Sequence, residues 1–288
     1  MWMMRRLRAA LCLALPAILL SAAAARAQEP PNAAASATSP SPGHATIKQA
    51  FRWSSFRLDD ARFDEQRNGR DAVLNTTVSV GIVRDFTLVV SGAALFREER
   101  FDLGRREVDN DGVSDITLLA KYRIWREDSN PLDTKRLSVL VGSDIRTGDD
   151  PFTSDGYNPI LGLAYTQIAG RHGVNLAALW RFTTGGVDPP TVMPGQTDAD
   201  LLTADFAYLY RIYPVEYSAE TPGALYGVVE LNGLYETNGD AQLFLSPGVM
   251  WEAQKYVIEA SVQVPVWQTL DNRARSDYVL MTGIRFSL

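Results

Sequence analysis

Hydrophobic and polar residues alternate along most of the chain, and the alternation is clearest between residues 114 and 125. Here Ile116, Leu118, Ala120, Tyr122 and Ile124 share one parity, and Asp115, Thr117, Lys121 and Arg123 share the other. Side chains of a β-strand point alternately to its two faces, so this pattern predicts a strand with one apolar and one polar face. The pattern recurs at 135–147, 174–183, 202–212 and 256–266.

Less regular segments fill the gaps between these strands, at 50–58, 72–83, 86–97, 156–168, 224–236 and 241–252, and the chain ends within a last one, 275–288. The total is twelve strands, with ten as the alternative count. The first is the weakest because Phe51, Trp53 and Phe56 do not keep one parity. Strands of about ten residues in an even number are typical of bacterial outer-membrane barrels. The sequence therefore predicts an all-β fold, a transmembrane antiparallel up-and-down β-barrel of about twelve strands over residues 48–288.

The connections between these strands agree with a barrel whose two termini are periplasmic. Short turns belong on the periplasmic side and longer loops outside. The predicted turns are 84–85, 127–134, 170–173, 214–222 and 253–255, and the predicted outer loops are 59–70, 98–113, 148–155, 185–199, 237–240 and 268–274. A soluble β-sandwich also alternates. The strand number, the strand lengths and the end of the chain on its final strand favour the membrane barrel.

The N-terminus has the three parts of a secretory signal: three arginines within residues 5–8, an apolar run over 9–25, and Ala25-Arg26-Ala27 before Gln28. This predicts a signal peptide over residues 1–27, cleaved after Ala27, and export to the bacterial outer membrane. The only cysteine, Cys12, lies in the removed part. The Pro-, Ala- and Ser-rich segment 28–47 predicts a flexible periplasmic leader.

The reactive residues do not suggest an enzyme. The two histidines, His44 and His172, have no serine and carboxylate at a spacing that would form a hydrolytic site. D-N-D-G-V-S-D at 109–115 resembles the start of a calcium loop, but its twelfth position, Ala120, is not the required glutamate. We therefore predict no catalytic residue, no metal and no cofactor. The net charge of −6 and the pI near 5.1 argue against nucleic acid as a partner.

Charged residues of both signs fall on the polar parity of the predicted strands. The lumen-facing candidates are Asp115, Lys121, Arg123, Asp144, Arg146, Arg181, Asp205, Arg211, Glu230, Glu252, Glu259 and Arg285. They either pair across the lumen and plug it, or line a polar path that orients a solute. Barrels of eight strands are filled and those of 16–18 are open, so about twelve strands predict a restricted passage suited to a small solute.

The segment 112–125, G-V-S-D-I-T-L-L-A-K-Y-R-I-W, resembles the signature G-x-G-D-x-T-L-x-x-K-Y-R-F of the meta-pathway phenol-degradation family of outer-membrane transporters. A Gly-Asp loop follows at 142–150, G-S-D-I-R-T-G-D-D, as in that family. Two positions depart from the pattern: Ser114 replaces the middle glycine, and the chain ends in Leu288, with the aromatic Phe286 two residues earlier.

The resemblance implies a barrel that takes up hydrophobic or aromatic small molecules, and it transfers no catalytic residue. The first functional hypothesis is therefore a channel or transporter for small solutes, and the alternative is a non-conducting structural or surface-interaction barrel. The expected partners are outer-membrane lipid, the solute, and the barrel-assembly machinery through the C-terminal strand.

Overall fold

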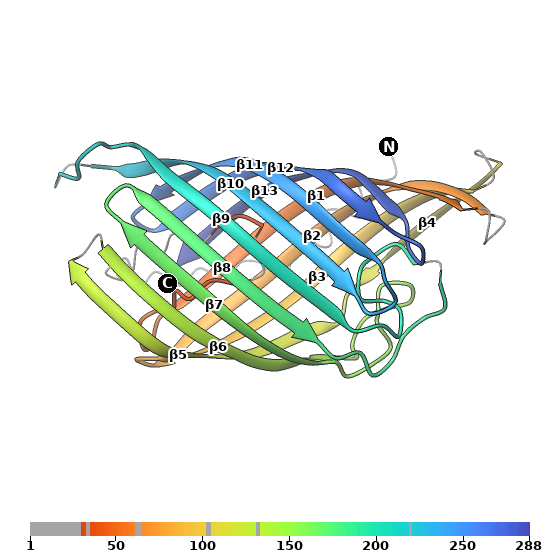
Figure 1. Cartoon of the computed structure of the whole chain (residues 1–288), viewed down its shortest axis with the longest axis horizontal. Helices are drawn as coiled ribbons and strands as arrows, with labels where there is room; N and C mark the ends of the chain where they lie inside the picture. The colour runs from red at the N-terminus through yellow and green to blue at the C-terminus, as the bar shows by residue number, and fades with distance from the viewer. Residues whose placement is uncertain are drawn as a thin grey trace.

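A computed structural model of the chain describes residues 30–32, 35–60, 65–101, 105–130, 133–189, 191–218 and 221–288. These residues form one antiparallel sheet that closes on itself, because β1 (Ala45–Asp60) pairs with both β2 (Glu65–Val83) and β13 (Arg275–Ser287). The other strands are β3 (Phe86–Phe101), β4 (Arg106–Val113), β5 (Ile116–Asn130), β6 (Asp133–Ile145), β7 (Pro159–Ala169), β8 (His172–Arg181), β9 (Leu201–Tyr213), β10 (Gly223–Glu236), β11 (Ala241–Ala253) and β12 (Tyr256–Thr269). The sheet is a barrel (Figure 1).

The thirteen labelled strands occupy twelve places around the barrel. Residues 86–91 of β3 pair with β5, and residues 94–101 of the same strand pair with β4. β4 and β5 are therefore two parts of one strand position, interrupted at Ser114 and Asp115. Apart from the closing pair β1 and β13, every other strand pairs with its neighbours in sequence. The predicted all-β, up-and-down barrel of about twelve strands is confirmed.

The connections lie at two ends of the barrel. Ala45 donates its N–H to Leu288 at 3.1 Å, so both ends of the sheet lie together at what we call the terminal end. The connections after β2, β5, β7, β9 and β11 lie at this end, as predicted. The turn expected over 127–134 is shorter, since β5 continues to Asn130. The opposite end, which we call the loop end, carries the long connections 146–158 and 182–200.

Two of the predicted outer loops are wrong. Most of 59–70 and 98–113 is strand, and β1 to β4 continue past the rest of the barrel as a projecting arm (Figure 1). The sequence suggested loops because both faces of the arm are polar. Ion pairs between neighbouring strands, Arg67 with Glu99 and Arg100 with Glu107, both at 3.1 Å, stabilise the ribbon without an apolar face. The calcium-like segment 109–115 lies in β4 and its junction with β5.

The outer surface of the barrel is apolar. Large apolar side chains are exposed on nearly every strand, among them Tyr122, Val141, Leu161, Leu176, Phe206, Val229, Val249, Ile258, Val264 and Leu280. Soluble monomers rarely expose contiguous apolar patches above a few hundred Å². The opposite parity is inward and mostly polar, so each strand has the two faces that its alternation predicts. No helix among the described residues is long and apolar enough to cross a membrane.

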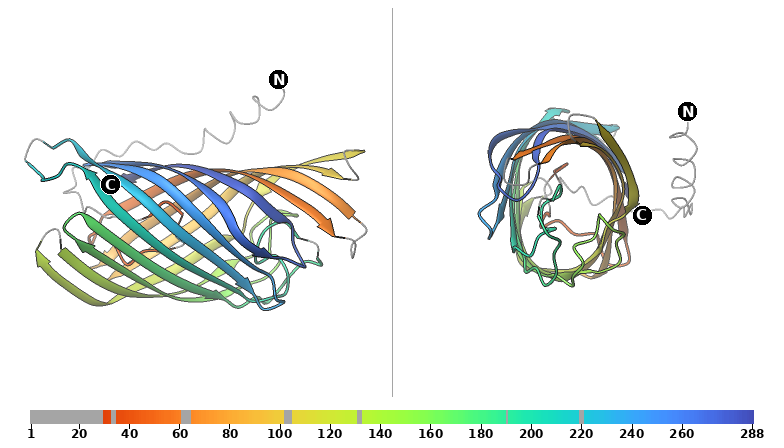
Figure 2. Two further views of the ribbon diagram at one scale, coloured as in Figure 1. Left: turned by 45° about the horizontal axis from the view of Figure 1, so that its top comes forward. Right: turned by 90° about the vertical axis from the view of Figure 1, so that its right-hand side faces the viewer.

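The segment before β1 enters the lumen. The sequence predicts a flexible periplasmic leader over 28–47, yet residues 30–32 and 35–40 lie within the ring of strands (Figure 2, right). Ala37 is fully buried, and its N–H donates to the Thr166 hydroxyl at 3.0 Å. Inward polar side chains of the strands thus form hydrogen bonds with the backbone of a segment that has no regular secondary structure of its own. The predicted signal peptide, 1–27, and its cleavage site lie outside the described residues.

Candidate functional site

The lumen holds most of the charged residues that the sequence assigned to it. Buried in the structure are Lys121, Arg123, Asp144, Asp205, Arg211, Glu230, Glu252, Glu259 and Arg285. Arg181 is half-buried and pairs with Asp144 across 2.7 Å. Two candidates lie elsewhere: Asp115 sits in the break between β4 and β5, and Arg146 is exposed in the loop after β6, where it pairs with Asp155. The function of the lumen-facing candidates as a path for a solute stays a prediction.

The middle of the lumen contains a chain of hydrogen bonds that runs across several strands. Asn232 donates to Asp205 at 2.8 Å, and Gln263 donates to Asn232 at 3.0 Å. Arg52 in turn donates to Gln263. Glu230, also fully buried, accepts from Asn32 of the leader. A buried polar network of this kind holds its members in fixed positions.

Ion pairs fill the lumen toward the terminal end. Glu259 lies between two cations, 3.0 Å from Lys48 and 3.1 Å from Arg285. Arg123 reaches the turn at 84–85 and donates to Asp85 at 2.6 and 2.9 Å. That hydrogen bond holds the pKa of Asp85 below its ordinary value. Pairing of both signs in a low-dielectric lumen leaves little unbalanced charge there.

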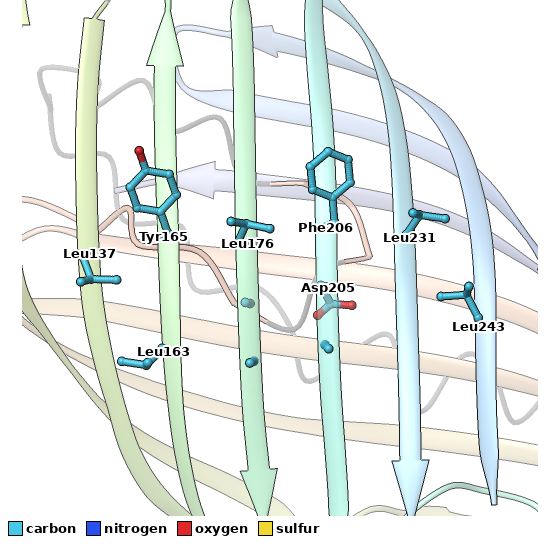
Figure 3. A pocket seen from close by; sticks show the side chains of 11 residues that line it. Leu137, Leu163, Tyr165, Leu176, Asp205, Phe206, Leu231 and Leu243 are labelled. Carbon is cyan, nitrogen blue, oxygen red and sulfur yellow. The ribbon is translucent and has the colours of Figure 1, made fainter.

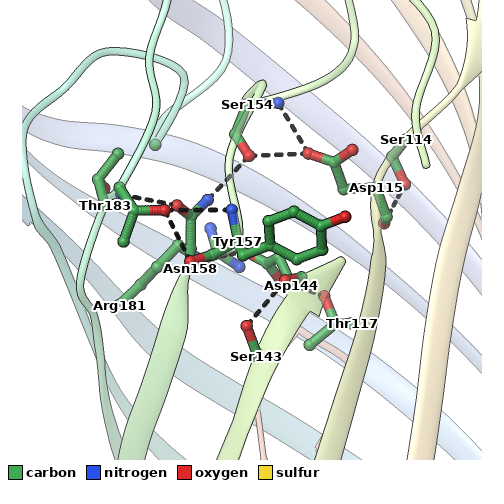
Figure 4. A network of polar contacts seen from close by, with 12 residues as sticks. Ser114, Asp115, Thr117, Ser143, Asp144, Ser154, Tyr157, Asn158, Arg181 and Thr183 are labelled. Atoms are coloured by element: carbon green, nitrogen blue, oxygen red, sulfur yellow. Dashed lines mark hydrogen bonds and ion pairs between the residues drawn. The ribbon is translucent and has the colours of Figure 1, made fainter. Parts of the chain in front are cut away.

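Loop 146–158 is tied to the loop end of the barrel through Asp115 (Figure 4). Its carboxylate accepts from Ser154 N at 2.8 Å, from Ser154 Oγ at 2.7 Å and from Thr153 Oγ1 at 2.9 Å. Partial burial raises the pKa of Asp115, but hydrogen bonds from Ser154, Gly148 and Thr153 outweigh it, so the net pKa is lowered. Asp115 thus acts as a structural anchor of the loop.

Loop 182–200 folds inward at the same end. Glu236 accepts from the backbone N–H of Gly195 at 2.6 Å and pairs with Arg273 at 3.1 Å. Gln196 reaches the neighbouring loop and donates to the carbonyl of Pro151 at 2.7 Å. The two loops therefore support each other over the loop end of the lumen.

A buried arginine completes this closure. The Arg97 guanidinium lies 5.6 Å from the ring of Phe56 and 5.3 Å from that of Phe152, and it pairs with Asp71. Phe56 faces inward and packs with Leu58 and Ala274. That inward position explains why Phe56 broke the parity of the first predicted strand.

Several inward residues were missed by the sequence analysis: Lys48, Arg52, Asp71, Arg97, Glu99 and Glu236. Most lie where the predicted strands were too short or their alternation was weak. Glu236 did carry a signal, because it shares the parity of Glu230 in the same segment. The histidines take no part in the lumen network: His172 bonds Tyr208 at 2.6 Å near the terminal end, and His44 contacts the carbonyl of Pro42 at 3.2 Å.

The outer wall carries a shallow groove of about 400 Å³ over β6 to β11 (Figure 3). Its walls are outward side chains such as Leu163, Tyr165, Leu176 and Phe206. Ala178 and Ala204, directly paired on β8 and β9, are too small to fill it. The ladder of hydrogen bonds is continuous at this point, so the groove is a surface depression and leaves no gap between strands.

A solved structure of an outer membrane channel shares this fold. The outer membrane channel COG4313 from Pseudomonas putida F1 is 12% identical, with a TM-score of 0.56, over 86% of this chain and 96% of that chain. The beta domain of the Bordetella autotransporter BrkA is 13% identical, with a TM-score of 0.48, over 85% and 100%. At such low identity the first likeness shows the fold alone.

No curated protein sequence matches this chain. A family profile does, and it spans residues 30–282, from the leader inside the lumen to the last strand. The match therefore covers the barrel as far as Thr282 in β13, together with the segment that enters it. The chain belongs to the family described as "Putative MetA-pathway of phenol degradation".

Proposed function

We propose that this protein is an outer-membrane channel for small solutes, with hydrophobic or aromatic molecules as its cargo. The observation that carries the proposal is the closed barrel with an apolar outer face and a polar, charged inner face. Such a barrel leaves no backbone group unpaired in lipid and separates a lumen from it. The membership of a phenol-degradation family and the shared fold of an outer membrane channel agree with this function.

The proposal includes the route to the membrane. The chain is exported by its N-terminal signal, cleaved after Ala27, and inserted with both ends of the sheet in the periplasm. Its C-terminal strand, β13, engages the barrel-assembly machinery, and its outer face contacts lipid. No catalytic step is assigned to any residue.

A second function, a non-conducting structural or surface-interaction barrel, is favoured by one observation. The lumen is crossed by paired charges and by the leader, and both loops fold over one end. The two functions differ in a measurable quantity, the flux of solute through the folded barrel.

The test is reconstitution of the full mature chain in planar bilayers and in liposomes. Folding is checked first by a heat-modifiable gel band. Discrete current steps or solute-driven swelling of the liposomes support the channel, and a folded barrel that passes neither ions nor phenol supports the structural function.

A pair of variants then tests whether the lumen charges define the path. Arg181→Ala removes a positive charge near the loop end of the lumen and should shift the ion selectivity toward cations. Arg57→Ala, an exposed arginine on β1 that pairs with Asp277 of β13, is the matched control and should leave the selectivity unchanged. Equal selectivity of the two variants would contradict a path past Arg181.

A further inference from the structure

One sector of the lumen wall, on β5 to β8, is apolar and lies beside charged sectors; a second buried apolar cluster, with Leu209, Tyr226 and Met250, lies on β9 to β12. The inward side chains of Leu119, Leu140, Ile160, Ala164 and Ala177 form one buried cluster on β5 to β8. Ala164 and Ala177 are directly paired across β7 and β8. We call these five residues the apolar wall. A wall of small and aliphatic side chains inside a lumen offers a surface for an apolar molecule, which paired charges do not.

In the structure the apolar wall is covered by the leader. Ala35 and Ala37 belong to the same buried cluster and are the groups that shield it from the lumen. The backbone around them is held by polar side chains at the rim of the wall. Thr166 accepts from the N–H of Ala37 at 3.0 Å, and Ser138 donates to its carbonyl at 3.4 Å.

Lys121 supplies the cation at this rim. Its ammonium donates to the carbonyl of Ser36 at 3.2 Å and to the carbonyl of Thr38. The Lys121 side chain is buried, so the loss of these two acceptors would carry a desolvation cost. A solute that enters with an oxygen atom beside Lys121 would replace them.

We propose, resting on the proposed function, that the apolar wall with Lys121 is the solute site of the channel, and that Ala35–Thr38 occupies it in competition with the solute. The ligand class is a small molecule with an apolar ring and one oxygen acceptor, such as a phenolic or carboxylate oxygen. The ring lies on the wall in place of the two alanine side chains, and the oxygen accepts from Lys121. Solute binding and displacement of the leader are then one linked equilibrium.

The leader has a second anchor, which lies at a distance from the apolar wall. Glu230 accepts from the N–H of Asn32 at 3.1 Å and from its side-chain amide at 2.9 Å, and Lys48 donates to the carbonyl of Pro31 at 2.9 Å. These contacts stabilise the state in which the leader covers the apolar wall, and they do not involve the residues of the solute site. Weakening them should make the site easier to open and leave its chemistry unchanged.

The first experiment measures exposure of the leader and does not require flux. The predicted mature chain has no cysteine, so Ala37→Cys supplies a single thiol at a fully buried position. Phenol should accelerate its reaction with a water-soluble thiol reagent by about fivefold or more, the lower end of couplings between linked sites. Toluene, which lacks the oxygen, should have a smaller effect.

Two variants in the Ala37→Cys background separate the parts of the mechanism. Lys121→Met should abolish the difference between phenol and toluene, and Lys121→Arg, which keeps the cation, should restore it and serves as the folding control. Glu230→Gln should raise the labelling rate even without solute. Each variant is accepted only if it retains the heat-modifiable band.

The second experiment locks the leader in place. Ala37→Cys with Ser138→Cys joins the leader to β6 by a disulfide, and oxidation should stop phenol flux, which a reductant restores. The solute site would be wrong, and the channel would stand, if two results came together: phenol does not change the labelling rate of Ala37→Cys, and the oxidised double variant still passes phenol. If phenol accelerates the labelling but no phenol flux is measured, the solute site stands and the channel function is wrong. If phenol neither changes the labelling nor passes through the barrel, both proposals are wrong.

Discussion

Arg97 provides the sharpest test of how the loop end of the barrel is held together. Its side chain is 3% exposed and that of its partner Asp71 is 8% exposed. The contact is bidentate, with Nε donating to Oδ1 at 2.8 Å and Nη2 donating to Oδ2 at 3.0 Å. The guanidinium also lies between the rings of Phe56 and Phe152. Arg97→Ala removes all of these contacts together.

The magnitude follows from the charge that the substitution leaves behind. Removing one partner of a buried ion pair costs about 3–5 kcal/mol, because the remaining charge is uncompensated. We therefore expect Arg97→Ala to lower the free energy of unfolding by about 3–5 kcal/mol. Loss of the ring contacts would add about 0.5–1 kcal/mol for each ring if the terms were additive, which neighbouring contacts are not.

Arg100 is the matched control on the same strand. It pairs with Glu98 and Glu107, but its side chain is 50% exposed, so water and salt screen the contacts. Exposed pairs contribute less than about 1 kcal/mol. Arg100→Ala should therefore change the stability by less than about 1 kcal/mol, although the chemical change is identical.

Equilibrium unfolding in urea, with the barrel in lipid vesicles and tryptophan fluorescence as the signal, measures both variants. The double variant Asp71→Asn with Arg97→Met removes both charges and should recover most of the lost stability. Equal costs for Arg97→Ala and Arg100→Ala would refute the reasoning, because Asp71 would then have to be hydrated. The same result would contradict the assignment of Arg97, Phe56 and Phe152 as a buried cluster that closes the loop end.

Three further substitutions test other parts of the barrel. Glu259→Gln should lower stability by about 3–5 kcal/mol, measured by the same unfolding assay, because Lys48 and Arg285 would lose their shared carboxylate. Val262→Arg, on the outer face, should cost about 2–4 kcal/mol if that position lies at the bilayer midplane, and an insertion yield equal to that of the wild type would contradict the membrane-facing assignment. The pKa of Asp115 is lowered from 3.8, so the carboxylate stabilises loop 146–158 above pH 3.8, and this stabilisation is lost as the pH falls through the lowered pKa. Cleavage of the loop by pepsin should therefore increase as the pH falls through that range. Asp115→Asn should remove this pH dependence.

The barrel wall could be predicted from the sequence because its information is local. Each strand carries its own alternation, and the segment with Leu118 and Lys121 shows both faces within a few residues. Burial and exposure along β5 follow that parity. The arm could not be predicted in the same way, since its strands have no apolar face and are stabilised by pairs such as Arg100 with Glu107.

The leader is the part that composition misrepresents. Its own residues are small and carry no pattern that would order them, so the sequence predicts a flexible segment. What orders it lies far along the chain: Glu230 is 198 residues from Asn32, and Lys121 is 83 residues from Thr38. Contacts of this kind have no local signature in the sequence.

The distribution of charge and apolar surface in the lumen implies that ion current and solute flux are separate properties. The ion pairs of Glu259 and the network around Asp205 hold fixed charges of both signs in the cross-section, which hinders small ions of either sign. An apolar solute depends instead on the wall around Leu140, which displacement of the leader uncovers. Conductance should therefore stay small even when phenol flux is high, and a large ohmic pore with no solute preference would contradict this division of the lumen.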